Sequence, residues 1–101
     1  KENDEWELPT FFDNKQFYLH GDFSAKKISN LNRQIIAYGG TVQNFISDKI
    51  DYVISDKEWN KDFEEAKKDN KKLLIVNEDW LMACFRRQKI VAHQPYEIKN
   101  D

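Results

Sequence analysis

Cysteine, glycine and proline are scarce in this chain, whose 101 residues include one cysteine, three glycines and two prolines. A single cysteine excludes an internal disulfide and is typical of a reducing compartment. No apolar run approaches the ~20 residues that a membrane-spanning helix needs, and the N-terminus lacks a signal-peptide pattern. The chain also has no repeats and no low-complexity stretch. These absences predict one compact domain that depends on its apolar core, with no membrane contact.

Net charge is close to balance, with 16 Lys and Arg against 18 Asp and Glu, a net charge of −2 and a pI of about 5.7. A general nucleic-acid binder usually has a basic excess, so we expect any DNA contact to be weak or absent. Basic residues still gather in two places. They are interpreted either as solvated helix ends and loops or as a local DNA-binding patch. They are Lys67, Lys68, Lys71 and Lys72, and then Arg86, Arg87 and Lys89.

Length and composition fit a single domain, since 40% of the residues are hydrophobic and 34% are charged. We predict an N-terminal tail over residues 1–7, one domain over 8–98 and a C-terminal tail over 99–101. Because the first residue is Lys and not Met, we expect this chain to be a piece of a longer protein.

The stretch from Asn77 to Lys89 predicts a terminal helix around which the domain is organised. Acidic residues stand in its first turn and basic residues in its last, which complements the helix dipole. An apolar run at 73–76, too short for a surface helix, precedes it and predicts a buried strand. The apolar face of the helix comprises Trp80, Leu81, Ala83, Cys84 and Phe85.

Upstream, strands and helices are expected to alternate. The predicted strands are Gln16–His20, Thr41–Phe45, Tyr52–Ile54 and Leu73–Val76; the predicted helices run from Ser24 to about Tyr38, from Asn60 to about Asp69, and from Asn77 onward. The resulting order, β-α-β-β-α-β-α, favours an α/β fold with a mostly parallel sheet and helices on both faces.

The first predicted helix has two distinct sides. Its core stripe consists of Ile28, Leu31, Ile35 and Tyr38, at spacings of three and four residues, and Gly39-Gly40 ends the helix. Ile36 falls away from that stripe. It shares a side with Ser29, Asn32 and Arg33, where it is either an interface residue or an isolated exposed isoleucine.

The segment before the first strand is unusually apolar. Leu8, Phe11 and Phe12 favour burial, and Pro9 is incompatible with a regular helix or a central strand. We therefore expect this segment to pack against a surface. That surface belongs either to an edge of its own domain or to a partner.

Recognisable catalytic and metal-binding sets are missing. His20 and His93 lie far apart in sequence, and Cys84 is placed as a small core hydrophobe, although a cysteine–histidine pair is a formal alternative. The spacings CxxC and HxxxH are absent, as are GxGxxG and the P-loop. We therefore interpret the chain as a binding module that uses no metal and no cofactor.

Several motifs together resemble the BRCT family over about residues 9–98. They are Gly21 after the first strand, Gly39-Gly40 after the first helix, the Tyr52-Val53-Ile54 strand, and Trp80 and Cys84 in the last helix. Gly39, Gly40, Trp80 and Cys84 would be structural residues in this family. Shorter matches run in register through nearly the whole chain, at Glu7–Phe12, Ser47-Asp48, Glu58-Trp59, Phe63–Ala66, Asp69-Asn70, Gln88-Lys89 and His93–Tyr96. They are similar to the C-terminal BRCT domains of single-strand-break repair scaffolds.

This resemblance implies both a fold and a function. The fold is a four-stranded parallel sheet of order 2-1-3-4, with the first and last helices on one face and the middle helix on the other. The function is that of a non-catalytic nuclear docking module in base-excision and single-strand-break repair. Its partner would be the BRCT domain of DNA ligase III or of an equivalent ligase, and it could also form a homodimer.

In such pairs the first helix and the segment before the first strand make the contact. The resemblance therefore predicts partner-binding residues at Trp6, Leu8, Pro9, Phe11, Phe12, Ser29, Asn32, Arg33 and Ile36. Ile36 has no dependable apolar counterpart in the family.

An alternative function within the family is phosphopeptide binding. Phosphate-binding members use a Ser or Thr at the end of the first strand, the next glycine N–H and a lysine of the middle helix. Here His20 occupies the first position, and Lys67 and Lys68 lie in the middle helix. Acidic residues in the early turns of that helix, at Asp62, Glu64 and Glu65, would repel phosphate.

Overall fold

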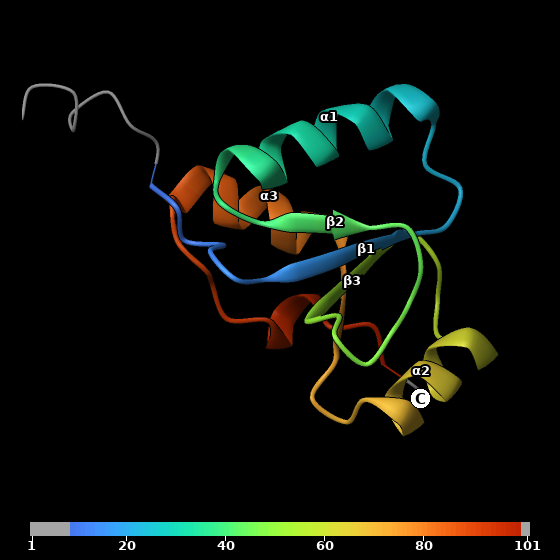
Figure 1. Ribbon diagram of the computed structural model, residues 1–101. Helices are drawn as coiled ribbons and strands as arrows, with labels where there is room; N and C mark the ends of the chain where they lie inside the picture. Colours follow the sequence, from blue (N-terminus) through green and yellow to red (C-terminus); the bar gives the residue numbers. More distant parts are fainter. Residues whose placement is uncertain (1–8, 100–101) are drawn as a thin grey trace, which may run out of the picture.

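The computed structural model describes residues 9–99, so the predicted contact residues Trp6 and Leu8 lie outside its described part. In chain order it contains β1 (Gln16–His20), α1 (Ala25–Ala37), β2 (Thr41–Gln43), β3 (Tyr52–Ser55), α2 (Lys61–Asp69), β4 (Leu74–Asn77), α3 (Glu78–Arg87) and the 3-10 helix η2 (Gln94–Tyr96) (Figure 1). This order of strands and α-helices is the predicted one.

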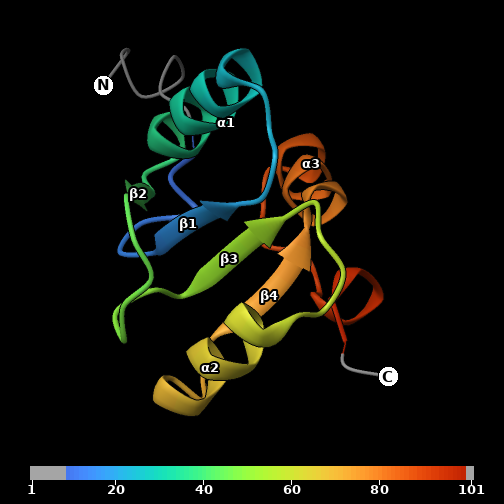
Figure 2. The ribbon, with the colours of Figure 1, turned by 90° about the vertical axis from the view of Figure 1, so that its right-hand side faces the viewer.

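All four strands are parallel, in the order β2-β1-β3-β4, which confirms the predicted sheet. The register aligns Tyr18 of β1 with Gln43 of β2 on one side and with Val53 of β3 on the other. Helices α1 and α3 cover one face of the sheet and α2 covers the other (Figure 2). The strands therefore have two faces to fill, and each has its own apolar cluster.

Each α-helix begins at a side chain that satisfies a free backbone N–H. Ser24 accepts a hydrogen bond from the N–H of Lys27, Asn60 from those of Asp62 and Phe63, and Asn77 from that of Trp80. Such caps stabilise a helix by about 1 kcal/mol each. In α2 and α3, acidic first turns and basic last turns add favourable dipole interactions.

The larger core lies between the sheet and the α1–α3 layer, and Trp80 is its centre. The indole is fully buried, stacks on Tyr52 at 4.5 Å, and donates a hydrogen bond from Nε1 to the carbonyl of Val91 at 3.0 Å. The other buried members of this cluster are Phe12, Phe17, Leu31, Ile35, Ile54, Val76, Leu81, Cys84 and Phe85.

The smaller core lies between the sheet and α2. Phe63 and Ala66 of the helix pack against Val53 of β3 and Ile75 of β4, with Ile50 and Leu73 completing the cluster. Phe63 is fully buried, and Ala66 retains 6% exposure. Both faces of the central strands are therefore covered, which agrees with their continuous apolar runs.

Two sequence predictions require correction. Ile28 was predicted in the core stripe of the first helix, yet it is 39% exposed, because the core takes only Leu31, Ile35 and Tyr38 from that helix region. The second strand was predicted to reach Phe45 but ends at Gln43, where pairing with β1 stops. Phe45 therefore lies in the β2–β3 loop, 64% exposed.

The C-terminal segment returns to the sheet beyond β4. The N–H of Ile98 donates to the carbonyl of Ile75 at 2.9 Å, and Glu97 forms an antiparallel bridge with Val76. The outer edge of β4 is thus partly covered by the chain's own continuation. Trp80 holds the start of this segment through its hydrogen bond to Val91.

Candidate protein-interaction surface

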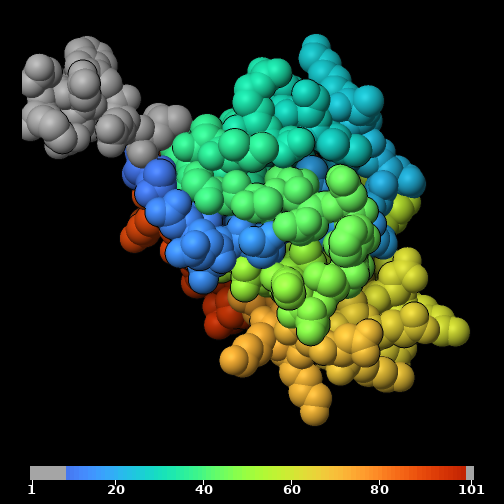
Figure 3. All heavy atoms as spheres, in the orientation of Figure 1, coloured from blue at the N-terminus to red at the C-terminus, as the bar shows by residue number. Residues whose placement is uncertain are grey.

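The outer side of α1 carries apolar side chains that no described element covers. Ile36 is 57% exposed and Ile28 39% exposed, whereas Leu31 and Ile35 are buried against the sheet. Ile28, Asn32 and Ile36 follow one another at a spacing of four residues and so share one side of the helix. Helix α1 forms the upper boundary of the molecule in Figures 1 and 3, with this layer accessible from outside.

Polar members of the predicted contact set lie on the same helix. Ser29 and Arg33 are exposed, and Asn32 is half-buried. The Oδ1 atom of Asn32 is itself buried, and no hydrogen-bond partner for it lies within the described residues. A buried acceptor without a donor costs ~1–3 kcal/mol.

The segment before β1 is fixed to the end of α1 by its aromatic residues. The Phe11 ring stacks on Tyr38 at 4.8 Å, and the N–H of Phe12 donates to the carbonyl of Tyr38 at 3.0 Å. Pro9 is exposed and Phe11 half-buried, so both border the outer side of the α1 layer. Of the two alternatives for this segment, the described residues pack on their own domain.

Phe12 corrects the predicted contact set. Its side chain is fully buried among Phe17, Trp80 and Phe85, with ring centroids 4.8 to 6.2 Å away. A fully buried ring cannot contact a partner without unfolding. Three apolar residues precede β1 in the sequence, and their order along the chain does not indicate which of them faces inward.

The two glycines at the end of α1 allow the helix end and the segment before β1 to pack closely. Gly39 has φ of +98°, and a Cβ there would lie 2.5 Å from the Asp13 carboxylate. A Cβ on Gly40 would lie 2.7 Å from a methyl carbon of Ile35. The tight turn therefore lets the segment before β1 approach the α1 C-terminus closely.

Cys84 is buried in the main core and not in a reactive site. Burial raises the pKa of its thiol, which keeps the sulfur protonated and unreactive at neutral pH. Within residues 9–99 no group of His, Cys, Asp and Glu side chains is arranged to hold a metal ion. None of the helices in this part of the chain has the length and apolar character of a bilayer crossing.

His20, the residue at the position that binds phosphate in other family members, lies where the carboxyl ends of β1 and β3 pair. Nδ1 of His20 lies 3.0 Å from the Ser55 hydroxyl, and Nε2 lies 3.5 Å from the Asp62 carboxylate. The Lys67 ammonium points elsewhere and donates to the carbonyl of Leu73 at 2.8 Å. The Asp62 carboxylate beside the imidazole would therefore repel a bound phosphate and attract a cationic group.

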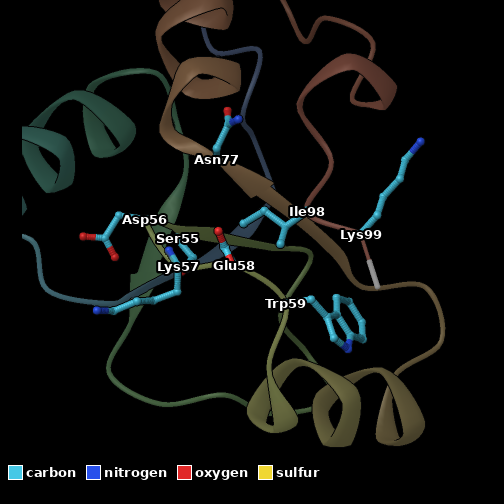
Figure 4. Close-up of a pocket in the computed structure, with 8 residues that line it drawn as sticks. All are labelled: Ser55, Asp56, Lys57, Glu58, Trp59, Asn77, Ile98 and Lys99. Carbon is cyan, nitrogen blue, oxygen red and sulfur yellow. The ribbon is translucent and has the colours of Figure 1, made fainter. Parts of the chain in front are cut away.

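A cavity of about 600 Å³ lies at the carboxyl ends of β3 and β4 (Figure 4). Glu58 and Ile98 stand near its centre, while Lys57 points away from Ile98 and Trp59. The Lys57 ammonium pairs with the Asp22 carboxylate, and this hydrogen bond lowers the pKa of Asp22. With charges of both signs in its walls, the cavity does not select a ligand by charge.

A second hollow was missed by the sequence analysis. It measures about 360 Å³ and lies between β1, the β2–β3 loop and α2. Phe45 and Ile46 form one wall. Because the sequence analysis places Phe45 in a strand, it does not predict the exposure of this side chain in a loop. The polar run Ser47-Asp48-Lys49, two residues further on, is the available signal.

Comparison with known proteins places these features in a family. The model of the BRCT domain matches residues 10–97. The human DNA repair protein XRCC1 is 38% identical over 92 residues, which cover 91% of this chain and 14% of that protein; the rat protein is 37% identical. The chain therefore spans a small part of the curated relatives that it matches.

Solved structures agree with this assignment. The C-terminal BRCT domain of human XRCC1 superposes with a TM-score of 0.87 at 37% identity, covering 94% of this chain and 99% of that one. BRCT domains 1 and 2 of Rad4, in complex with an Mdb1 phosphopeptide, superpose with a TM-score of 0.75 at 21% identity, covering 91% of this chain and 48% of that one. At that identity the Rad4 likeness supports the fold alone. This chain belongs to the BRCT family, and within it is similar to the C-terminal domain of XRCC1.

Proposed function

We propose that this domain is a non-catalytic protein-interaction module of a nuclear DNA repair scaffold. Its partner would be the BRCT domain of DNA ligase III or of an equivalent ligase, and a second copy of the domain would compete for the same surface. The similarity to XRCC1, a DNA repair protein, supports the setting in base-excision and single-strand-break repair. The surface of α1 supports the mode of action.

The observation that carries this proposal is the exposure of Ile36. The Ile36 side chain is 57% exposed. Asn32 lies one helical turn before it and Ile28 two turns before it, on the same side of α1. Together the three residues form a compact apolar patch with a polar residue at its centre. Full burial of an isoleucine side chain contributes ~1.5–3 kcal/mol.

Arg33 and Pro9 would form the border of this interface. Arg33 is exposed beside Ile36 on the helix, and arginine is enriched among residues that dominate binding energies. Pro9 and Phe11 lie at the C-terminal end of the same helix because Phe11 stacks on Tyr38. Helix α1 and the segment before β1 therefore present one continuous surface.

Sedimentation velocity with matched variants tests the proposal. Ile36→Asp places a charge within the patch, and Gln34→Asp places the same charge on another exposed side of α1. We expect Ile36→Asp to weaken self-association, or association with a ligase III-type BRCT domain, by at least tenfold. Gln34→Asp should associate as the unmodified domain does.

Circular dichroism on both variants controls for folding. If a folded Ile36→Asp variant associates as strongly as Gln34→Asp, the α1 surface is not the interface. If the unmodified domain stays monomeric and ignores the ligase domain, that partner is excluded.

A further inference from the structure

A groove on the α2 side of the molecule is independent of the α1 surface. Its floor consists of Tyr18, His20 and Ala66, and its outer wall consists of Phe45 and Ile46 from the β2–β3 loop. Helix α2 packs below β3 and β4, so the α2-facing side of β1 is covered mainly by this loop (Figure 2). The small side chain of Ala66 leaves space in the floor.

Phe45 separates this groove from a second hollow. It lines the cavity of about 360 Å³ beside α2 and also a neighbouring cavity of about 380 Å³ beside Gln16 and Gln43. At 64% exposure it is the most exposed of the large hydrophobic side chains in the described part of the chain. An aromatic ring that stands between two hollows offers both of its sides to a ligand.

The opposite wall of the groove is negative. Asp62, Glu65 and Asp69 follow one another at spacings of three and four residues, so their carboxylates share the side of α2 that borders the groove. Within residues 9–99, no Lys or Arg lies within ion-pair distance of any of the three. Among the described residues, the only ionisable partner of these carboxylates is His20, 3.5 Å from Asp62.

We propose that this groove docks a segment of a partner protein that inserts an arginine side chain. The guanidinium would lie between the carboxylates of α2 and the ring of Phe45, and an apolar neighbour in the segment would cover Ile46. Arginine fits this combination because its planar head binds carboxylates in two-point contacts and stacks on aromatic faces. An acidic or phosphorylated segment would be repelled by the same wall.

This inference goes beyond the α1 interface and does not rest on it. The α1 surface lies on the opposite face of the sheet, so the two can be occupied together (Figures 1 and 2). One domain would then pair with another BRCT domain through α1 and hold a basic segment through the groove.

Nuclear magnetic resonance of the 101-residue chain, labelled with ¹⁵N, tests the groove directly. The probe is a blocked pentapeptide with one arginine between two leucines, and its control has citrulline in place of arginine. We expect the arginine peptide to shift amide signals of the β2–β3 loop and of α2, around Phe45 and Glu65. The citrulline peptide, which has nearly the same shape and no charge, should bind at least fivefold more weakly.

A matched pair of variants on α2 adds specificity. Glu65→Gln combined with Asp69→Asn removes two carboxylates from the groove, and Glu64→Gln removes one that does not line it. We expect the double variant to weaken binding about tenfold, the size expected for the loss of two exposed ion pairs. Phe45→Ala should also weaken binding, and it should leave the fold intact because that ring is mostly exposed.

Three results would overturn the proposal. They are equal binding of the arginine and citrulline peptides, equal weakening by Glu64→Gln and by the double variant, and peptide-induced shifts that spread over the whole surface. Each would show that the groove does not recognise a cationic side chain. None of them bears on association through α1, which sedimentation measures separately.

Discussion

Trp80 combines burial, stacking and a hydrogen bond in one side chain. It is fully buried, its ring stacks on Tyr52, and its indole N–H reaches the carbonyl of Val91. It therefore joins α3, the sheet and the C-terminal segment.

We predict that Trp80→Ala lowers the free energy of unfolding by ~3–5 kcal/mol, the usual cost of truncating a large buried aromatic side chain. Urea unfolding followed by circular dichroism measures the change. Phe45→Ala is the matched control and should cost less than ~1 kcal/mol, because its ring is 64% exposed. An unchanged midpoint for Trp80→Ala would show that the core is wrongly placed.

At the scale of elements, the turn at the end of α1 determines the position of the segment before β1. Gly39 takes a φ of +98° and leaves no room for a Cβ beside the Asp13 carboxylate. Positive φ is strained for every residue with a Cβ, at ~1–3 kcal/mol. Because Phe12 binds the backbone of Tyr38, strain at this turn would be transmitted to the aromatic residues of the segment.

We therefore predict that Gly39→Ala destabilises the domain by ~1–3 kcal/mol and weakens association through α1 more than stability alone explains. Thermal unfolding gives the first quantity, and sedimentation of the folded variant gives the second. Ala37→Gly is the control, since it changes an exposed position two residues earlier and leaves the turn intact. A Gly39→Ala variant as stable as the parent would show that the turn relaxes without strain.

The elements themselves were largely predictable, because their signals are local. Apolar spacing located the strands and helices, and the predicted helix starts at Ser24 and Asn60 coincide with the observed caps. The order of the strands in the sheet was predicted only from the resemblance to the BRCT family, because periodicity does not determine which strands are neighbours.

The wrong predictions share a physical cause, which is that burial depends on neighbours distant in sequence. Ile28 continues the stripe of Leu31 and Ile35, but the core does not extend that far along α1. Phe11 and Phe12 are the same residue type at adjacent positions, yet only Phe12 is fully buried, whereas Phe11 is half-buried. The groove beside α2 was missed for the same reason, since its walls come from three separate segments.

At the scale of the whole molecule, the two proposed surfaces differ in chemistry as well as in position. The α1 patch is mainly apolar, with Ile28 and Ile36, whereas the groove combines Phe45 with three carboxylates. Salt screens exposed charges, with a Debye length of ~10 Å at 0.1 M, and has little effect on apolar burial. Ionic strength should therefore separate the two activities.

We predict that raising the salt concentration from about 50 to 500 mM weakens peptide binding in the groove several-fold and changes α1-mediated association less than twofold. Titrations of the same preparation, by nuclear magnetic resonance for the peptide and by sedimentation for association, give both numbers. A steep loss of association with salt would instead indicate that charged residues such as Arg33 dominate that interface.

The contact between Trp80 and Val91 also has a consequence for synthesis on the ribosome. The main core is built from both ends of the chain, with Phe12 and Phe17 near the start and Trp80, Leu81 and Phe85 near the end. The central strand β3 lies between β1 and β4, so the sheet is incomplete until β4 has been made. The nascent domain therefore cannot complete the cover of its early aromatic residues until Val91 has left the exit tunnel.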